Sequence, residues 1–556
     1  MPNPMNPLIR SLLVAPLFLV VLACRLATSM AIPTATSAPT LTPTPTPLPP
    51  TSPPSLATPL PAPPTPTSLP ATVTPVAAAP PIATPEVDWS DLSPYQEAML
   101  PEFAADVETV AAAGASRYYL EIELELPPDK ANSPRLNGRE RVRYTNTETV
   151  ALSEIYFRLY PNLPGYGGKM TVEQVVIDNH AVEPETVAND SALRIPLAQP
   201  LAPGAVTDIT LMYQADVPKE TEQGYNIFSA SDGTLALAGF YPAIAVYDET
   251  GWNIEIPPPY GDATYLDTSL YRVELTVPEK MVVVASGGLL DSTANDNGTK
   301  TLSLVSGPMR DFYLAARADF EVISETVDNV TVNSYYPPDL AEGGKLALRY
   351  AADSLRVFNQ RFGPYPFAEF DVVATPTSAG GVEYPGVVVV AQFIYDEPGG
   401  FFQHATAHEV AHQWWYGLVG NDQVDEPWLD ESLTNYSTIL YWETVEGAEN
   451  AQQVIDTLFF GPYEQAKNQG QDRAVIGPVA NFSEGEYGAF VYGKGPLFFH
   501  ALRQEIGDET YFKIMQSYYA EYKYKIAQPE DLLALIEQVS GRNVEPLVET
   551  WLEKRN

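Results

Sequence analysis

The chain has 556 residues, which is too many for one hydrophobic core, so we expect two or three domains. Its 31 basic and 70 acidic residues give a formal net charge of −39. This charge argues against a nucleic-acid partner, because phosphate binding needs a basic surface. The only cysteine is Cys24, which excludes an intrachain disulfide.

Residues 1–23 have the pattern of a signal peptide. Arg10 precedes an apolar run over residues 12–22, which is too short to span a bilayer comfortably. The run ends in Val-Leu-Ala-Cys24, which resembles a bacterial lipoprotein signal and implies acylation of Cys24. An ordinary signal peptide and an uncleaved anchor are the alternatives. All three place the bulk of the chain outside the cytoplasm, and the lipoprotein interpretation anchors it to the outer face of the cell membrane through Cys24 alone.

Residues 24–86 are predicted to form a stalk. From Ile32 to Pro85 the sequence consists almost wholly of Pro, Thr, Ala, Ser, Leu and Val, and it has no charged residue. Such a segment cannot build a core and favours an extended, polyproline-like conformation. At ~3.1 Å per residue it would span on the order of 150 Å.

Residues 87–325 are predicted to form an antiparallel β domain. Apolar residues from Leu120 to Leu126 alternate with glutamates, a period of two that is typical of a half-buried strand. Similar stretches, separated by clusters of Asn, Gly, Pro and Asp, cover residues 141–144, 155–160, 209–215 and 271–277.

Residues 326–556 have a different pattern, which predicts a mostly helical domain. An amphipathic helix is expected over Lys345–Phe362, ended by Gly363-Pro364. A strand at 370–374, a Gly-rich segment at 380–386 and a strand at 387–390 follow. The remaining predicted helices cover residues 430–443, 496–506, 509–522, 530–539 and 544–554.

The sequence His408-Glu-Val-Ala-His412 predicts a metal site. On a helix this spacing places two imidazoles one turn apart on the same face, where both can reach one ion. Glu431, separated from His412 by eighteen residues and lying in Trp-Leu-Asp-Glu-Ser, supplies a third ligand and leaves the fourth position of a tetrahedral zinc open for water. Glu409 is the candidate general base that activates this water. The pattern indicates a zinc peptidase with one Zn²⁺ per chain.

Two further segments resemble the gluzincin aminopeptidases, the family of aminopeptidase N. Gly380-Gly-Val-Glu-Tyr384 precedes the metal motif and Tyr492-Gly-Lys-Gly495 follows it, in the order of that family's Gly-Ala-Met-Glu-Asn and Tyr-x-Lys-Gly segments. The likeness covers residues from about 115 to 556. It implies a multidomain α+β architecture, in which the antiparallel β domain precedes a thermolysin-like catalytic domain that ends in a helical part.

The resemblance also implies roles for four more residues. Tyr492 would donate its phenol to the transition-state oxyanion, and Glu383 would bind the free α-amino group of the substrate. Gly380 and Gly381 would let their backbone hydrogen-bond the substrate chain. Val382 and Tyr384 stand where the family has Met and Asn, which leaves the preference for the first substrate side chain open.

The implied activity is hydrolysis of the N-terminal peptide bond of peptides that have a free amino terminus. A thermolysin-type endopeptidase is the alternative if Glu383 does not face the cleft. A catalytically silent surface-binding module is the alternative from another class, although all the residues that the chemistry needs are present. The sequence leaves the oligomeric state open.

Overall fold

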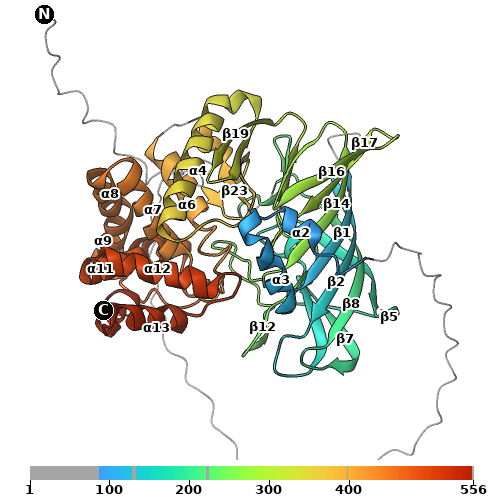
Figure 1. Ribbon diagram of the computed structural model, residues 1–556, viewed down its shortest axis with the longest axis horizontal. Helices are drawn as coiled ribbons and strands as arrows, with labels where there is room; N and C mark the ends of the chain where they lie inside the picture. Colours follow the sequence, from blue (N-terminus) through green and yellow to red (C-terminus); the bar gives the residue numbers. More distant parts are fainter. Residues whose placement is uncertain (1–86, 128–132, 221–223, 397–398, 554–556) are drawn as a thin grey trace, which may run out of the picture. The chain divides into compact units, whose positions relative to one another are not determined.

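The computed structural model describes residues 87–127, 133–220, 224–396 and 399–553, which belong to one compact unit (Figure 1). The predicted signal peptide, Cys24 and the whole of the predicted stalk lie outside the described residues. Strands fill the first half of this unit and helices the second, as the α+β prediction requires. Within the described ranges, no helix combines the length and the apolarity needed to cross a membrane.

The largest sheet has eight strands in the order β16-β17-β14-β1-β2-β8-β4-β5. The alternating segment is strand β1 (Arg117–Glu125), whose apolar residues are buried while most of the intervening ones are partly exposed. The other strands are β2 (Arg135–Thr145), β4 (Lys169–Ile177), β5 (His180–Val182), β8 (Val206–Asp216), β14 (Leu270–Pro278), β16 (Gly288–Ala294) and β17 (Thr299–Val305).

The expectation of a purely antiparallel β domain was wrong for one pair of strands. Strand β1 pairs with β2 in the antiparallel sense, but it pairs with β14 in parallel, with Arg117 opposite Leu270. The two strands are separated by more than 140 residues of other structure, well above the minimum of about a dozen that a parallel crossover needs. No local periodicity shows the direction of a strand pair formed over this distance.

Smaller sheets complete this part of the molecule and share its core. One is β15-β18-β10-β9, a second is β11-β3-β7-β6, and a two-stranded ribbon joins β12 to β13. Their bounds are β3 (Leu152–Arg158), β6 (Glu185–Val187), β7 (Ala192–Leu201), β9 (Phe228–Ser231), β10 (Thr234–Leu237), β11 (Ala243–Ile244), β12 (Tyr247–Asp248), β13 (Gly251–Trp252), β15 (Val282–Ala285) and β18 (Leu314–Arg317). Two short helices, α2 (Ser93–Glu97) and α3 (Ala104–Ala112), precede them.

A five-stranded mixed sheet, ordered β19-β20-β21-β23-β22, begins the second part. Its strands are β19 (Glu321–Val327), β20 (Val330–Tyr336), β21 (Glu369–Thr375), β22 (Gly381–Val382) and β23 (Val387–Ala391). The predicted boundary between residues 325 and 326 falls inside the hairpin β19–β20, which pairs with β21 of this sheet. The second part therefore begins earlier than predicted, at Glu321. The predicted amphipathic helix is α4 (Ala341–Arg361), which packs against β19, β20 and the later helices.

The helices after this sheet enclose a second core, at the opposite side of the view from β1 and β2 in Figure 1. They are α5 (Gln392–Tyr395), α6 (Gly400–Ala411), α7 (Glu431–Val445), α8 (Ala448–Val454), α9 (Gly461–Asn468), α10 (Glu484–Ala489), α11 (Gly495–Ile506), α12 (Asp508–Tyr522), α13 (Pro529–Ser540) and α14 (Glu545–Val548). Helix α6 packs against α4, α7 and β23. The side chains of Trp414, Trp415 and Trp428 are fully buried in this core. The packing therefore holds α6 and α7, which carry the predicted metal ligands, in a rigid setting.

Candidate metal centre

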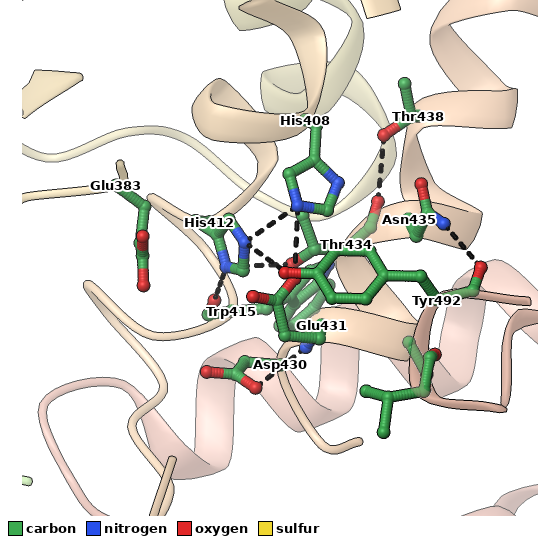
Figure 2. Close-up of polar contacts among 12 residues, drawn as sticks. Glu383, His408, His412, Trp415, Asp430, Glu431, Thr434, Asn435, Thr438 and Tyr492 are labelled. Carbon is green, nitrogen blue, oxygen red and sulfur yellow. Dashed lines mark hydrogen bonds and ion pairs between the residues drawn. The ribbon is translucent and has the colours of Figure 1, made fainter. Parts of the chain in front are cut away.

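Helices α6 and α7 bring the three predicted metal ligands together (Figure 2). His408 lies in the last turn of α6, His412 caps that helix, and Glu431 is the first residue of α7. Nε2 of His408 lies 3.1 Å from Nε2 of His412 and 3.1 Å from Oε2 of Glu431, and the third side of the triangle measures 3.5 Å. Three donor atoms from two helices thus point at one position.

The triangle fits a tetrahedrally coordinated divalent ion. With metal–ligand distances of about 2.0–2.1 Å, neighbouring ligands of a tetrahedral zinc lie about 3.3–3.5 Å apart. The observed separations of 3.1, 3.1 and 3.5 Å are close to this value. Two imidazoles and one carboxylate are also the ligand types of a catalytic zinc site with one open position. The residues present therefore fit a zinc ion.

Neighbouring groups fix the orientation of these ligands. Nδ1 of His412 donates to the carbonyl of Trp415 at 3.0 Å, and the hydroxyl of Thr434 lies 3.2 Å from the same nitrogen. Such a contact directs the other ring nitrogen towards the metal position. Asp430 caps α7, since its Oδ1 accepts a hydrogen bond of 2.7 Å from the backbone N–H of Glu431. Asp430 is a residue type that favours helix starts, and this cap sets where the ligand-bearing helix begins.

The charges around the triangle favour a cation. Burial alone would lower the pKa of His412, but the carboxylates of Glu383, Glu431 and Glu409 together raise it to about 10. Burial alone would raise the pKa of Glu431, but His408 and His412 hold it well below its usual range. Without a metal, the site thus attracts a proton to an imidazole, and a divalent ion would replace that proton.

Glu409 lies on α6 between the two histidines, against the backbone of Gly381. A Cβ atom at position 381 would overlap the carboxylate of Glu409, so only glycine allows this approach. Glu409 is almost completely buried, and this burial raises the pKa of its carboxyl group well above its usual value. A raised pKa suits a group that accepts a proton from water and passes it on.

Glu383 lies on the side of His412 away from His408 in Figure 2. Gln423 bridges two carboxylates, because its Nε2 donates to Oε1 of Glu383 at 2.7 Å and to Oδ2 of Asp430 at 2.8 Å. Glu383, His412 and Asp430 also form a second group of close potential ligand atoms. The site thus extends beyond the metal position as a buried acidic patch made of Glu383, Asp430 and Glu431.

The segment before Glu383 is an edge strand. Gly381 and Val382 pair with β23 on one side, and the backbone of Gly380 accepts a hydrogen bond from Ala391. Strand β22 ends the sheet order, so its other side has no strand partner among the described residues. An extended peptide could add to that side by backbone hydrogen bonds. Tyr384, next in the segment, turns away into the core, where its ring stacks on Tyr313 at 4.0 Å.

Tyr492 comes from the π-helical turn η6 (Phe490–Lys494), which joins α10 to α11. Its ring lies 5.8 Å from that of His408, and its phenol lies beside the ligand triangle (Figure 2). Burial and the nearby Glu431 raise the pKa of this phenol well above its usual value, so it keeps its proton and can donate it. Lys494 of the same segment does not share this position, since it is buried and bonded to Asp472 at 2.8 Å.

Comparison with known proteins agrees with this geometry. Residues 346–551, which hold the metal ligands and Tyr492, match the Peptidase family M1 domain. Residues 346–551 are named the M1 domain after the family that they match.

Several plant and fungal aminopeptidases are similar to part of the chain. Aminopeptidase M1-B of rice (Oryza sativa subsp. japonica) is 28% identical over 299 residues, which are 51% of this chain and 34% of that protein. The alanine/arginine aminopeptidase of Saccharomyces cerevisiae is 26% identical over 274 residues, which are 46% of this chain and 32% of that protein. The chain thus spans about a third of the length of these relatives.

A solved structure shares the fold over most of both chains. The M1 zinc metallopeptidase of Deinococcus radiodurans superimposes with a TM-score of 0.63 at 22% identity, and the match covers 80% of this chain and 94% of the other. The match extends well beyond the M1 domain into the β sheets that precede it. The architecture of both parts is therefore a known one.

The β sheets contribute a residue to the M1 site that the sequence analysis missed. Asp262, on the loop between β13 and β14, is half-buried beside Glu431, Glu383 and Asp430, and desolvation together with these carboxylates raises its pKa well above its usual value. Tyr260 fixes the loop by donating to the carbonyl of Phe482 at 2.6 Å. Nothing near Asp262 in the sequence marks it, since it reaches the site only because the two parts pack together.

Arg310, which follows β17, holds the loop that follows α6, the helix that carries His408. Its guanidinium is buried and donates to the carbonyls of Tyr416 at 2.7 Å and Leu266 at 3.2 Å. Tyr416 has a φ of 123°, a strained conformation for a residue other than glycine that costs about 1–3 kcal/mol. The bond from Arg310 stabilises this strained turn, four residues beyond His412, from outside the M1 domain.

Proposed function

We propose that this protein is a zinc-dependent aminopeptidase that hydrolyses the N-terminal peptide bond of peptides. The observation that carries the proposal is the convergence of His408, His412 and Glu431 beside the carboxylate of Glu383. The first three residues fit a catalytic zinc site, and the fourth offers a negative charge where the amino terminus of a bound peptide would lie. The names of the similar proteins support the same activity.

In this proposal His408, His412 and Glu431 hold one zinc ion. Zinc supplies Lewis-acid chemistry, which lowers the pKa of a water molecule and polarises the peptide carbonyl. Glu409 takes the proton of the attacking water and delivers it to the leaving amine. The phenol of Tyr492 donates a hydrogen bond to the oxyanion, which is stabilised more than the ground-state carbonyl.

Glu383 would select substrates with a free amino terminus. Gln423 holds its carboxylate in place, and Asp262 lies beside it from the β-sheet part. An ammonium group among these acids gains charge-assisted hydrogen bonds, whereas an acetylated terminus cannot donate them in the same number. The peptide chain would then continue along the free edge of β22, where the backbone of Gly380 and Gly381 could bond it.

The test uses the chain from Val87 onwards, supplied with zinc, and a peptide beside its acetylated twin. We expect stepwise release of N-terminal residues from the free peptide only. We expect Glu383→Ala to cost about 2–5 kcal/mol in kcat/KM on the free peptide, the usual cost of removing one partner of a buried charge pair. Glu426→Ala, a nearby acid outside the ligand triangle and the acidic patch, serves as the matched control. Internal cleavage of both peptides would show a thermolysin-type endopeptidase, and zinc binding without cleavage would show a silent binding module.

We also propose that the enzyme is a lipoprotein displayed outside the cytoplasm. Residues 1–23 would act as the signal peptide and Cys24 would carry the lipid. The segment up to residue 86, which is uncharged from Ile32 to Pro85, would act as the stalk of the β-domain and the catalytic domain. Metabolic labelling with a radioactive fatty acid tests this organisation. The wild-type chain should become labelled and sediment with membranes, whereas Cys24→Ser should be unlabelled.

A further inference from the structure

Two buried polar side chains lie one helical turn from the metal ligands and belong to none of the sequence motifs. His404 lies on α6, four residues before His408, and Asn435 lies on α7, four residues after Glu431. A spacing of four places each on the same helix face as the neighbouring ligand. The side chains are 8% and 4% exposed, so each must find its hydrogen bonds within the protein.

These two side chains form a chain of hydrogen bonds that ends at the catalytic tyrosine. Nε2 of His404 lies 3.0 Å from Oδ1 of Asn435. Figure 2 shows the next bond, in which Nδ2 of Asn435 donates to the backbone carbonyl of Tyr492 at 2.7 Å. Because a carbonyl only accepts, the amide must turn its Nδ2 to Tyr492 and its Oδ1 to His404. His404 must therefore donate from Nε2, and burial keeps the ring neutral by lowering its pKa to about 3.

The carbonyl of Tyr492 has a specific need for this donor. In an α-helix it would accept from the N–H of the residue four positions later, but that residue is Pro496, which has no N–H. The turn that carries Tyr492 is also π-helical, a geometry that is often found at functional sites. Asn435 thus bonds the carbonyl that Pro496 leaves without its α-helical donor.

We propose that His404 and Asn435 are positioning residues, which set the distance between the phenol of Tyr492 and the metal ligands. The inference rests on the proposed function. His404 and Asn435 connect three elements. These are α6, which leads into the two histidine ligands, α7, which begins at the third ligand, and the turn that carries Tyr492. Ser432 makes a second link, with a hydrogen bond of 2.6 Å to the carbonyl of Val491, whereas Asn435 bonds the backbone carbonyl of Tyr492 itself.

A purely structural role for the pair predicts a different result. Two apolar residues of similar shape would pack here with similar stability, since replacing both partners of a buried hydrogen bond by apolar groups is nearly neutral. A positioning role instead predicts a loss in the chemical step, because a shift of about 1 Å at a catalytic group costs about 100-fold in rate. The loss of kcat should also disappear in a variant that lacks the hydroxyl of Tyr492, because there is then no phenol to position.

The experiment is a double-mutant cycle on the zinc-loaded chain with Asn435→Leu, Tyr492→Phe and both together. We expect Asn435→Leu to lower kcat about 10- to 100-fold, as loss of a supporting contact at a metal site does, with KM and bound zinc nearly unchanged. In the Tyr492→Phe background the same substitution should have almost no further effect. Thr438→Val is the matched control, since Thr438 also lies on α7 but bonds only within that helix, to Thr434. It should leave kcat unchanged.

A second pair of variants changes His404, which lies at the other end of the chain of hydrogen bonds. His404→Leu removes the donor to Asn435 and should also lower kcat, whereas His404→Gln keeps an amide donor and should restore most of it. This pair decides the question if Asn435→Leu does not fold. Losses that add fully in the cycle, or that match the control, would overturn the inference.

Free and acetylated peptides are assayed together, so that the two proposals can fail separately. If the wild type cuts acetylated peptides internally, the aminopeptidase proposal fails while the cycle still measures the action of Asn435 through Tyr492. If the wild type acts as an aminopeptidase but the losses add, the positioning proposal fails alone. No cleavage of either peptide overturns both.

Discussion

Two buried glutamates, one in each part of the molecule, have pKa values that are shifted in opposite directions. Glu140 on β2 is 0% exposed and Glu431 on α7 is 2% exposed. Burial raises the pKa of Glu140 well above its usual value, and neither of its oxygens accepts a hydrogen bond from a described residue. Two imidazoles hold the pKa of Glu431 well below its usual value instead.

The comparison separates burial from function. Burial alone drives a carboxyl group to its neutral form, which cannot serve as a strong metal ligand. At the metal centre the protein surrounds a buried carboxylate with groups that keep it charged, and it adds Asp262, Glu383 and Asp430 nearby. Without a cation, the raised pKa values of Asp262 and Asp430 keep these groups protonated. A cation, either zinc or the amino terminus of a substrate, would stabilise their charged forms.

The largest expected effect is loss of the charged glutamate at the metal centre. We expect Glu431→Gln to lower kcat/KM by about 1,000-fold or more and to weaken zinc binding, because a charged ligand becomes a neutral one. Zinc binding to the metal-free wild type at pH 7.5 should also release about one proton, since the pKa of His412 is raised to about 10 in the metal-free state.

Calorimetry in two buffers of different ionisation enthalpy measures this proton release. The Glu431→Gln variant should release fewer protons, because Glu431 is one of the carboxylates that raise the pKa of His412. Equal release from the wild type and the variant would contradict the electrostatic account of the site.

The next effect concerns the two phenols beside Glu431. Tyr492 and Tyr487 have ring centres 5.6 Å apart, and the pKa of each is raised by burial and then by Glu431. We expect Tyr492→Phe to lower kcat about 100- to 1,000-fold, the usual effect of losing an oxyanion donor. Tyr487→Phe should lower it less than about tenfold. Steady-state kinetics with matched zinc content decides between them, and a larger loss at Tyr487 would reverse the assignment.

The smallest effect is expected at the unpartnered glutamate of the β sheet. The pKa of the Glu140 carboxyl group is higher in the folded protein than its value of about 4.3 in the unfolded chain. The stability that the protonated group contributes is therefore fully present below about pH 4.3, and it is lost as the pH rises towards the folded-state pKa. We therefore expect Glu140→Gln to raise the melting temperature, with a gain that grows from pH 5 to pH 8 and exceeds about 1 kcal/mol at pH 8.

Glu121→Gln on the neighbouring strand is the control for this change. Glu121 is partly exposed and forms ion pairs with Arg139 and Arg141, so its loss should cost about 1 kcal/mol or less. Melting curves at several pH values measure both variants. A gain for Glu140→Gln that does not depend on pH would show that Glu140 is not destabilised by its charge.

The sequence predicted the elements whose residues repeat with a local period. Alternation over residues 120–126 predicted β1, and the apolar pattern over 345–362 predicted α4 within a few residues of each end. The two histidines of the metal site were predictable because a spacing of four places them on one helix face whatever the rest of the chain does. Periodicity carries no information on pairing direction, so the parallel contact between β1 and β14 was missed.

By itself, then, the sequence predicted the residues proposed to carry the chemistry: His408, Glu409, His412, Glu431 and Tyr492. Only the tertiary structure decided what surrounds them. Asp262 and Arg310 reach the M1 domain from the β-sheet part, and His404 joins Asn435 across two helices. These contacts join residues far apart in the chain, and their geometry is set by how the two cores pack. Spacing within one helix is fixed by covalent geometry, whereas contacts between elements are fixed by packing, which no short stretch of sequence contains.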